Sequence, residues 1–556
     1  MGYPPHVEAL ARPSAYPRTA GARSVQTLET HISYLFLTGE RVYKVKKPVD
    51  FSFLNFTTLA RRRWYCHEEV RLNRRLSPEV YLGVAEIRGD GGHYAVGGRG
   101  RLVDYAVVMR QMPQDRTVRR LLERGMVTRR HVEYLARCIW EFHRKAEHTD
   151  AIARLGGVRA VKRSVEENFS QSAGMVGVTI SRQDYDLAQA YQTAFLDEAA
   201  GVLRQRAAEG RVRDCHGDLH TAQIYLEEDH ASQHGAKAAF LDCIEFNKRF
   251  RYLDTASDLA FLAMDFDELG EPGLSSALVE EYVRLSGDKG LQDVLPFFKA
   301  YRAYVRGKVE GFRLEDSNLR GGQRDEVAAR SRRYFALSAA YARPPGPLLL
   351  VTCGLMATGK SVLARALASR LNATVLSSDI VRKVFRGIAP TERHAEAWGQ
   401  GLYAETSLED TYHDLFREAR PLLAEGGRVI LDASFRKQAW RRDARRLSAE
   451  TGASFVLIEC RAPDDVIRAR LETRLRETSD ASDARWELFQ QQKAAFEPVA
   501  GLPRSEHVVV EASAPAPEVT PKALRMVFRS LLAQRGPALA SGGSGHAAVP
   551  ITAGAA

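Results

Sequence analysis

The alternation of apolar and polar positions near the N-terminus predicts a β-hairpin. Residues 31–37 and 42–47 read as strands, and residues 38–41 form the turn between them. Because side chains alternate along a strand, Val42, Lys44 and Lys46 share one face of the second strand. A lysine on an inner face needs an acid or a phosphate as its partner, whereas on an exposed edge it protects the strand from aggregation. Both readings are open for this segment.

A helical repeat follows over residues 57–76, with Thr57 or Thr58 as its cap and Ser77-Pro78 as its stop. Its apolar stripe is made by Tyr65, Glu69, Leu72 and Leu76. Glu69 therefore lies on the buried face and requires a cation, for which we expect Lys44. A further strand at 105–109, a connector at 110–113 and helix over 118–146 complete this pattern.

The C-terminal half alternates short apolar runs with helical stretches. The runs at 347–352, 374–376, 428–432, 455–460 and 507–510 read as buried parallel strands, and residues 362–371 read as a helix. This order predicts an α/β domain, a parallel sheet flanked by helices. The N-terminal half, with its hairpin and later helices, predicts a separate α+β domain.

Breaks in the pattern predict the domain boundaries. Residues 1–24 contain four prolines and no clear periodicity, so we expect a flexible arm. The first domain spans 25–342, a stiff Arg-Pro-Pro-Gly-Pro linker occupies 343–347, and the second domain spans 348–535. The Gly/Ala/Ser-rich residues 536–556 predict a disordered tail.

Composition narrows the class of protein. The 556 residues are 45% apolar and 27% charged, which is typical of globular domains. No apolar stretch approaches the roughly 20 residues that span a bilayer, and six scattered cysteines form no C-x-x-C pair, so we expect a cytoplasmic chain without a membrane partner. The net charge of +11 permits a nucleic-acid partner but does not favour one, because acids accompany the basic residues throughout.

One stretch fits the phosphate-binding template G-x-x-x-x-G-K-[ST] at every specified position. It consists of Gly354, Leu355, Met356, Ala357, Thr358, Gly359, Lys360 and Ser361. A strand precedes it and a helix follows it, so backbone N–H groups and the helix N-terminus can close around the phosphates of ATP. Lys360 then reaches the β- and γ-phosphates, and the Ser361 hydroxyl binds Mg²⁺.

Further candidates lie at the predicted strand ends of this domain. Asp432 ends an apolar strand and suits a second Mg²⁺ contact. Asp379 can orient or deprotonate an acceptor hydroxyl with Arg382 holding an anionic group, or else residues 377–379 merely cap a helix. The predicted helix 464–477 reads either as a lid that closes on the transferring phosphoryl or as a solvated basic face. Its arginines are Arg468, Arg470, Arg474 and Arg476.

A second constellation lies in the first domain, at Cys215-His216-Gly217-Asp218-Leu219-His220. This polar loop leads into a strand, and a later strand ends at Asp242, so a hairpin would bring Asp218 and Asp242 to one end of a sheet. One carboxylate can take a proton from an attacking hydroxyl while the other holds Mg²⁺. Asp254 and Asp258, four residues apart on a predicted helix, can brace the loop.

His216-Gly217-Asp218-Leu219-His220 with Asp242 resembles the aminoglycoside phosphotransferase family, over about residues 28–335. The resemblance implies a two-lobed, protein-kinase-like fold in which Asp218 is the catalytic base, Asp242 binds Mg²⁺, and Lys44 pairs with Glu69 over the phosphates of ATP. The family usually has an asparagine as a second metal ligand where this chain has Gln223. The longer side chain puts metal binding, and turnover at this site, in question.

Residues 346–534 resemble small P-loop kinases of metabolites, including gluconate kinase-like and polynucleotide-kinase-like proteins. The resemblance rests on the P-loop, Ser378-Asp379 with Arg382, Leu431-Asp432, and the arginine-rich segment followed by Ser482-Asp483-Ala484. The order of the two modules resembles a bacterial family described as bifunctional aminoglycoside phosphotransferase and ATP-binding protein.

Together these features predict an ATP- and Mg²⁺-dependent phosphotransferase that acts on hydroxyl groups of small molecules, with one nucleotide site in each domain. Two alternatives stay open. In the first, a single P-loop metabolite kinase is regulated by an N-terminal pseudokinase or binding module. In the second, the protein is a kinase of polynucleotide or nucleoside 5′-hydroxyl groups.

Overall fold

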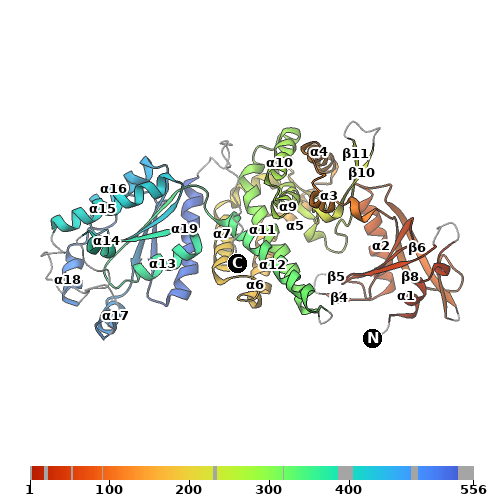
Figure 1. Ribbon diagram of the computed structural model, residues 1–556, viewed down its shortest axis with the longest axis horizontal. Coiled ribbons are helices and arrows are strands. Elements are labelled where there is room, and N and C mark those ends of the chain that lie inside the picture. The colour runs from red at the N-terminus through yellow and green to blue at the C-terminus, as the bar shows by residue number, and fades with distance from the viewer. Residues whose placement is uncertain are drawn as a thin grey trace. The chain divides into compact units, whose positions relative to one another are not determined.

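The computed structural model describes residues 3–17, 23–51, 54–90, 92–229, 235–316, 319–385, 405–476 and 486–535. The chain forms two compact units (Figure 1). The first contains the described residues up to 163 and residues 202–302, and the second contains residues 164–201 and the described chain from 303 onward. Within the described residues, no helix is both long enough and apolar enough to cross a bilayer.

An antiparallel sheet forms the N-terminal part of the first unit, with the strand order β1-β2-β3-β8-β6-β7. The strands are β1 (Gln26–Glu29), β2 (Ser33–Leu37), β3 (Arg41–Lys46), β6 (Tyr81–Asp90), β7 (His93–Val96) and β8 (Arg101–Arg110). The predicted hairpin is β2 and β3, which pair from Leu37↔Val42 to Ser33↔Lys46. Thr58 caps helix α2 (Leu59–Asn73) as expected, and α2 packs on β8 and β6.

The prediction of a flexible N-terminal arm is wrong for the described residues. Pro5 starts helix α1 (Pro5–Leu10), and a short 3-10 turn follows at Pro13–Ala15. Val7 and Leu10 are buried against Tyr43, and the Tyr16 hydroxyl donates to the Leu10 carbonyl at 2.5 Å. Proline is well tolerated in the first helical turn, so a residue that suggested disorder here begins a helix that covers the sheet.

The rest of the first unit is mainly helical. Its elements are α3 (Val118–Glu123), α4 (Arg129–Lys145), α5 (Asp150–Gly156), α8 (Ala200–Ala208), α9 (Thr255–Glu268), α10 (Pro272–Ser286) and the start of α11 (Leu291–Phe312). Two short strand pairs lie among them, β9 (Val212–Asp214) with β12 (Tyr252–Asp254), and β10 (Ile224–Glu228) with β11 (Ala236–Phe240). A sheet with one long helix, followed by a helical lobe that holds a hairpin, is the protein-kinase-like fold that the sequence predicts.

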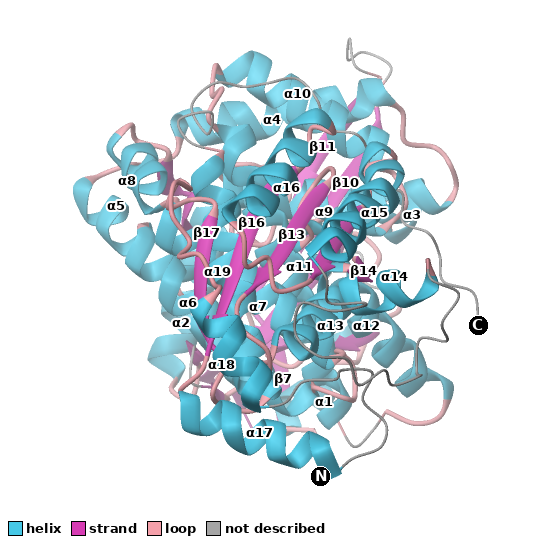
Figure 2. Ribbon diagram, turned by 90° about the vertical axis from the view of Figure 1, so that its left-hand side faces the viewer, coloured by secondary structure: helices cyan, strands magenta, loops and turns pink. Residues whose placement is uncertain are grey.

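A parallel sheet lies at the centre of the P-loop part of the second unit, with the order β14-β15-β13-β16-β17. The strands are β13 (Leu348–Cys353), β14 (Thr374–Ser377), β15 (Arg428–Asp432), β16 (Ser454–Arg461) and β17 (His507–Glu511), of which β17, β16 and β13 stand side by side in Figure 2. Helices α13 (Lys360–Leu371) and α19 (Ala516–Gln534) cover one face. Helices α15 (Glu405–Ala424) and α16 (Gln438–Glu450) cover the other, so the predicted flanked sheet is confirmed.

Helices that precede residue 343 also belong to the second unit, among them α7 (Arg182–Glu198) and α12 (Gly322–Ala342). Helix α7 packs along α19, where the rings of Tyr191 and Phe528 lie 5.6 Å apart. It also contacts α13, because Arg370 Nη2 lies 2.7 Å from Asp186 Oδ2. The helix that begins at Lys360 is therefore anchored at its far end to α7.

Candidate active sites

Lys44, Glu69 and Asp242 meet at the inner face of the antiparallel sheet. The Lys44 ammonium lies 2.8 Å from Glu69 Oε1 and 2.8 Å from Asp242 Oδ1. Strand β3 supplies the lysine, α2 supplies the glutamate, and the residues after β11 supply the aspartate. The structure thus brings together three residues that the sequence analysis singled out from widely separated segments.

A second lysine on the same face extends this cluster. Lys46 is fully buried, lies 2.6 Å from Glu69 Oε2 and also pairs with Glu245. The alternation along the strand predicted that Lys46 shares a face with Lys44. No sequence pattern indicated Glu245, because only the chain reversal after β11 brings residue 245 to β3. Glu245 is three residues beyond Asp242, so its ion pair also fixes the segment that carries Asp242.

Interactions between opposite charges keep Glu69 and Lys44 ionised. Burial raises the pKa of Glu69, but Lys44 and Lys46 outweigh that effect and lower the pKa to about 2. Burial lowers the pKa of Lys44, yet Asp242 and Glu69 more than compensate, and it lies well above its ordinary value. Lys44 therefore stays a cation, with its charge balanced by carboxylates.

Asp218 lies on the loop between β9 and β10, and Asp258 braces that loop. Asp258 accepts hydrogen bonds from the backbone N–H groups of His216 and Gly217, each at 2.9 Å, as the sequence analysis proposed. Gly217 has φ of +88°, and a Cβ there would lie 2.5 Å from the Phe250 carbonyl, so the loop requires glycine. Asp218 itself is partly exposed, and His220 Nε2 lies 3.5 Å from its Oδ2.

The buried residues His143, Cys215 and Asp258 have potential ligand atoms within 4.8 Å of one another. His143 Nε2 already lies 3.1 Å from Asp258 Oδ2, and its Nδ1 lies 2.8 Å from the Tyr282 hydroxyl. Burial also raises the pKa of the Cys215 thiol well above its ordinary value. Hydrogen bonds therefore explain this group as a brace for the loop.

Gln223 and Asp242 lie at the same end of the β10–β11 hairpin. The Leu241 N–H donates to the Gln223 carbonyl at 2.9 Å, directly beyond the pair Ile224↔Phe240. Asp242 has a left-handed backbone with φ of +62°, and its N–H donates to the Tyr81 hydroxyl at 3.0 Å. The predicted hairpin is confirmed, and its backbone places at one end two residues, Gln223 and Asp242, whose side chains carry oxygens of the kind that Mg²⁺ prefers.

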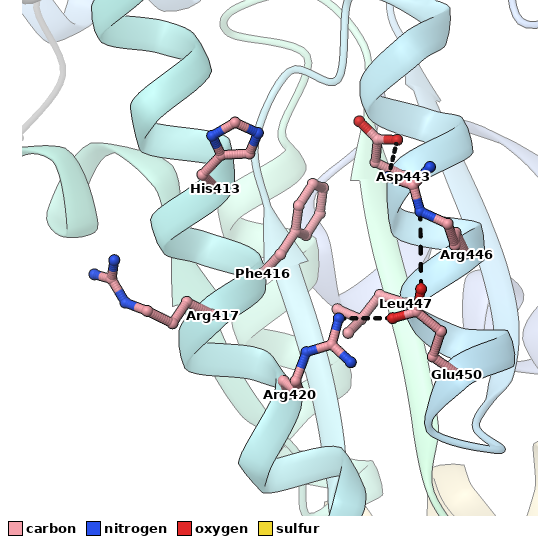
Figure 3. A pocket seen from close by; sticks show the side chains of 8 residues that line it. All are labelled: His413, Phe416, Arg417, Arg420, Asp443, Arg446, Leu447 and Glu450. Atoms are coloured by element: carbon pink, nitrogen blue, oxygen red, sulfur yellow. Dashed lines mark hydrogen bonds and ion pairs between the residues drawn. The ribbon is translucent and has the colours of Figure 1, made fainter.

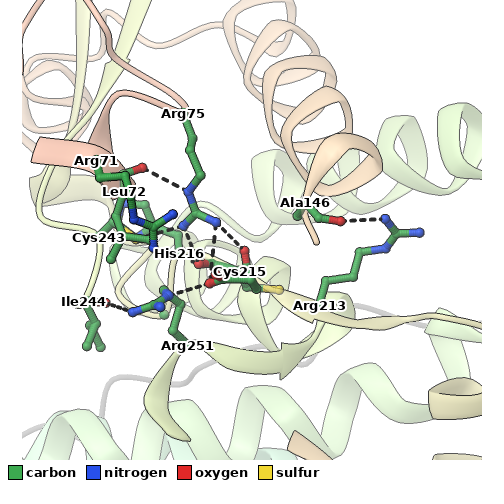
Figure 4. A network of polar contacts seen from close by, with 12 residues as sticks. Arg71, Leu72, Arg75, Ala146, Arg213, Cys215, His216, Cys243, Ile244 and Arg251 are labelled. Carbon is green, nitrogen blue, oxygen red and sulfur yellow. Dashed lines mark hydrogen bonds and ion pairs between the residues drawn. The ribbon is translucent and has the colours of Figure 1, made fainter. Parts of the chain in front are cut away.

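Arg75 connects the segment before Asp218 with the segment after Asp242 (Figure 4). Its guanidinium donates to the Asp214 carbonyl at 2.7 Å, to the Cys215 carbonyl at 3.1 Å and to Cys243 Sγ at 3.2 Å. It therefore contacts the residues just before His216 and just after Asp242. No sequence pattern indicated this role, since Arg75 follows α2 in an unremarkable basic stretch.

The P-loop of the second unit has the backbone that its glycines permit. Gly354 has φ of +131°, and a Cβ there would lie 2.4 Å from the Cys460 carbonyl. Gly359 has φ of +95° and is the N-cap of α13, which starts at Lys360. Strand, loop and helix follow one another as predicted, so the N-terminus of α13 points its N–H groups at the loop.

Lys360 is held inside this loop by an uncharged group. Its ammonium donates to the Leu355 carbonyl at 2.6 Å, and the Thr358 hydroxyl donates to the same oxygen at 2.7 Å. Desolvation by burial lowers the pKa of Lys360, with Asp432 opposing the shift. The lysine is thus a half-buried cation for which phosphate oxygens would be favourable partners.

The strand ends beside the P-loop carry the other predicted residues. Asp432 is buried at the end of β15, and the Thr352 hydroxyl donates to its Oδ1 at 3.2 Å. Asp379 lies in the first turn of α14 (Ser378–Val384), where it is partly exposed and 2.8 Å from Arg382 Nη2. Ser377 occupies the N-cap position but makes no capping hydrogen bond through its side chain.

Arg470 approaches the P-loop from α17 (Asp464–Arg476). It donates to the Ala357 carbonyl at 3.3 Å and to the Ala512 carbonyl at 2.7 Å. Arg474 follows one turn later on α17, but its side chain lies outside the described residues, as does that of Arg476. The segment Ser482-Asp483-Ala484 and the tail 536–556 also lie outside the described chain.

A cavity of about 520 Å³ opens beside the P-loop, between α13, α17 and the residues before α19. Its lining is mostly alkyl, with Arg470 as the charged member, and includes Gly359, Val362, Val466, Ala512 and Pro515. Such a pocket next to a phosphate-binding loop fits the flat, largely apolar faces of a nucleobase.

Another cavity, of about 310 Å³, lies between α15 and α16 (Figure 3). Its arginines already have acidic partners, since Arg420 lies 2.6 Å from Glu450 and Arg446 lies 2.7 Å from Asp443. Because α16 runs back from the carboxyl end of β15, Glu450 lies at the opposite end of the sheet from the P-loop. This cavity is therefore separate from the nucleotide site.

Comparison with known proteins agrees with the P-loop assignment. Residues 349–499 match the family described as AAA domain. The chain is 31% identical over 458 residues to the uncharacterized protein Rv2004c of Mycobacterium tuberculosis, which covers 82% of this chain and 88% of that protein. The uncharacterized protein Mb2027c of Mycobacterium bovis matches equally. The chain therefore belongs to the same family as these mycobacterial proteins, and its P-loop implies that it binds a nucleotide.

Solved structures resemble each half separately. A gluconokinase from Sinorhizobium meliloti covers 35% of this chain and 96% of its own, with 18% identity and a TM-score of 0.25. A choline/ethanolamine kinase family protein from Mesorhizobium loti covers 60% of this chain and 98% of its own, with 14% identity and a TM-score of 0.33.

Proposed function

We propose that this protein is an ATP- and Mg²⁺-dependent phosphotransferase with one nucleotide site in each unit, acting on hydroxyl groups of small molecules. The observation that carries the proposal is the position of two half-buried lysines, Lys44 and Lys360. Lys44 lies 2.8 Å from Asp242, which is suited to a metal, and Lys360 lies in the P-loop that follows β13, whose neighbour β15 ends at Asp432. Both sites supply positioning and charge neutralisation, which is what phosphoryl transfer requires of a protein.

In the first unit, Asp218 is the proposed base. It accepts the proton of the acceptor hydroxyl while that oxygen forms a bond to the γ-phosphorus of ATP and the bond to the bridging oxygen breaks, so that ADP leaves. Lys44, held by Glu69, neutralises the phosphates. The Asp258 brace and the Arg75 contacts keep Asp218 and Asp242 in position for this step.

In the second unit, the backbone N–H groups of the P-loop and Lys360 hold the phosphates, and the cavity lined by Val362 and Pro515 takes the nucleobase. Asp379 orients or deprotonates the acceptor hydroxyl, and Arg382 holds an anionic part of the acceptor. Arg470 and Arg474 are proposed to stabilise the charge on the transferring phosphoryl.

Mg²⁺ fits the donor sets of both sites. Asp242 with the amide oxygen of Gln223 offers one set, and the Ser361 hydroxyl with Asp432 offers the other. When bound, Mg²⁺ would neutralise charge on the phosphates during transfer. The residues are hard oxygen donors, as this ion requires.

The test is ATP turnover by the full chain across sugars, aminoglycosides, nucleosides and oligonucleotides, for the wild-type protein and for the variants Asp218→Ala and Lys360→Ala. We expect each variant to lose a different activity. If Asp218→Ala leaves every turnover and the affinity for ATP unchanged, the first site does not transfer phosphate. Phosphorylation of an oligonucleotide 5′-end would instead favour a nucleic-acid acceptor.

A second candidate function is favoured by Gln223. If its longer side chain places the amide oxygen poorly for octahedral Mg²⁺, the first unit binds nucleotide without turnover and regulates the P-loop kinase. The variant Gln223→Asn separates the two functions, because it should create or raise turnover at the first site only if metal geometry limits it.

A further inference from the structure

The P-loop makes a contact with α18 (Trp486–Ala494) that the proposed roles do not use. The N–H of Met356, the third residue of the loop, donates to Gln492 Oε1 at 2.7 Å. Gln492 is 9% exposed and comes from a helix 136 positions further along the chain. A buried side-chain amide thus occupies a backbone donor of the phosphate-binding loop.

Helix α18 is seated on the loop by apolar contacts as well. Phe489, one turn before Gln492, is fully buried in a cluster with Ala357, Ile467 and Leu471. Trp486 stacks on Phe489 with ring centroids 5.0 Å apart. The hydrogen bond from Met356 is therefore held in place by a packed interface between the loop, α17 and α18.

The bonded groups belong to one peptide unit. The Leu355 carbonyl and the Met356 N–H are the two ends of the same planar peptide. The carbonyl accepts from the Lys360 ammonium at 2.6 Å, while the N–H donates to Gln492. The orientation of this peptide therefore depends on Lys360 on one side and on Gln492 on the other.

We propose that Gln492 is a positioning residue for the nucleotide, which orients the Leu355–Met356 peptide and thereby Lys360 at the β- and γ-phosphate end of the site. This inference rests on the proposed P-loop function. The Lys360 ammonium has three donors, so it can keep the Leu355 carbonyl as one partner while the others bind phosphate, and a peptide fixed by Gln492 holds that partner in place. Because a lysine of this kind reaches the β- and γ-phosphates, Gln492 lies near the end of the nucleotide that distinguishes ATP from ADP.

The contact also connects the loop to the residues that follow β15. Beyond α18, the Glu497 N–H donates to the Arg436 carbonyl at 3.0 Å, and Arg441 donates to the Glu497 carbonyl at 3.0 Å. Arg436 follows the strand that ends at Asp432. The segment from Gln492 to Glu497 therefore bridges the P-loop and the residues after β15.

The test compares Gln492→Glu and Gln492→Met in a chain that also carries Asp242→Asn, so that the first site does not compete. The probes are fluorescent analogues of ATP and ADP with Mg²⁺. Glutamate keeps the acceptor for the Met356 N–H but adds a charge, so we expect the affinity for the ATP analogue to fall about tenfold or more, and that for the ADP analogue clearly less. Methionine removes the acceptor, and we expect both affinities to fall about fivefold.

Gln491→Glu is the matched control, because Gln491 is the exposed neighbour on the same helix and receives the same charge. Unchanged affinities in both Gln492 variants, or an equal loss of both analogues in Gln492→Glu, would overturn the inference. Melting temperatures identify a variant that fails to fold, and the other variant then decides. If the parent chain binds neither analogue, or if Lys360→Ala binds as well as the parent, the proposed function fails instead.

Discussion

The two candidate phosphate sites surround a half-buried lysine with opposite kinds of partner. Lys44 lies between two carboxylates, Glu69 and Asp242, which raise its pKa. Lys360 donates to a neutral carbonyl, and burial lowers its pKa. The first site thus holds its cation in a balanced network, whereas the second keeps a poorly compensated charge that a phosphate would stabilise. The comparison shows that two candidate sites for the same ligand can differ in how far the surrounding residues compensate the charge of their lysine.

The largest expected effect tests the balanced network. Glu69→Gln leaves Lys44 and the fully buried Lys46 without a shared carboxylate, and breaking such a buried pair costs about 3 to 5 kcal/mol. We expect faster hydrogen exchange in β3 and β8 by the corresponding factor, measured by mass spectrometry. Glu86→Gln is the control, because Glu86 on β6 pairs with the partly exposed Arg88 and should cost less than about 1 kcal/mol. Equal changes of hydrogen exchange in the two variants would show that Glu69 does not stabilise the lysine cluster.

The next effect separates the sites. Wild-type protein should bind two ATP molecules per chain, and Lys360→Ala and Lys44→Ala should each retain one, with about 100-fold weaker binding at the altered site. Isothermal titration calorimetry measures both stoichiometry and affinity. Lys237→Ala, at an exposed strand position, should bind like the wild type. A single ATP per wild-type chain would contradict the two-site proposal.

A smaller effect should appear with pH. Since the pKa of Lys360 lies below its ordinary value of 10.5, the ammonium is lost at lower pH than in a free lysine, and phosphate binding weakens as pH rises towards that pKa. Lys44 has a raised pKa and keeps its proton over the same range. As pH rises towards the pKa of Lys360, we expect the affinity for ATP to fall in Asp242→Asn, which reports the second site, and to stay constant in Lys360→Ala. If the affinity for ATP depended on pH in the same way in both variants, the two lysines would not differ in pKa as described.

The smallest effect concerns the support of the P-loop helix. Arg370→Gln removes the ion pair with Asp186 that anchors the end of α13 to α7. We expect about 1 to 2 kcal/mol of local destabilisation, seen as faster hydrogen exchange in α7 and the end of α13. Arg365→Gln, at an exposed position on the same helix, is the control and should change exchange little.

The sequence predicted what is contiguous or periodic. Eight adjacent residues specify the P-loop, and helical spacing placed Glu69 opposite Lys44. The spacing of four residues also identified Asp258 as a brace, whereas Asp254, predicted with it, instead pairs with Arg206 and caps α9. The sequence did not predict Glu245 beside Lys46 or Gln492 beside Met356, because these contacts join positions 199 and 136 residues apart without any local pattern. Strand β6 was missed, and the prolines of α1 were taken as signs of disorder.

The packing of α7 on α19 has a practical consequence for dissecting this protein. A fragment that begins at residue 348 would keep every strand of the parallel sheet, yet it would expose the side of α19 on which Tyr191 packs and leave Arg370 without Asp186. Cleavage in the proline-rich stretch 343–347 would cut the chain without removing that packing. Recombination at this stretch would, like the fragment, transfer the parallel sheet without α7. The unit that packs together is therefore larger than the predicted domain 348–535.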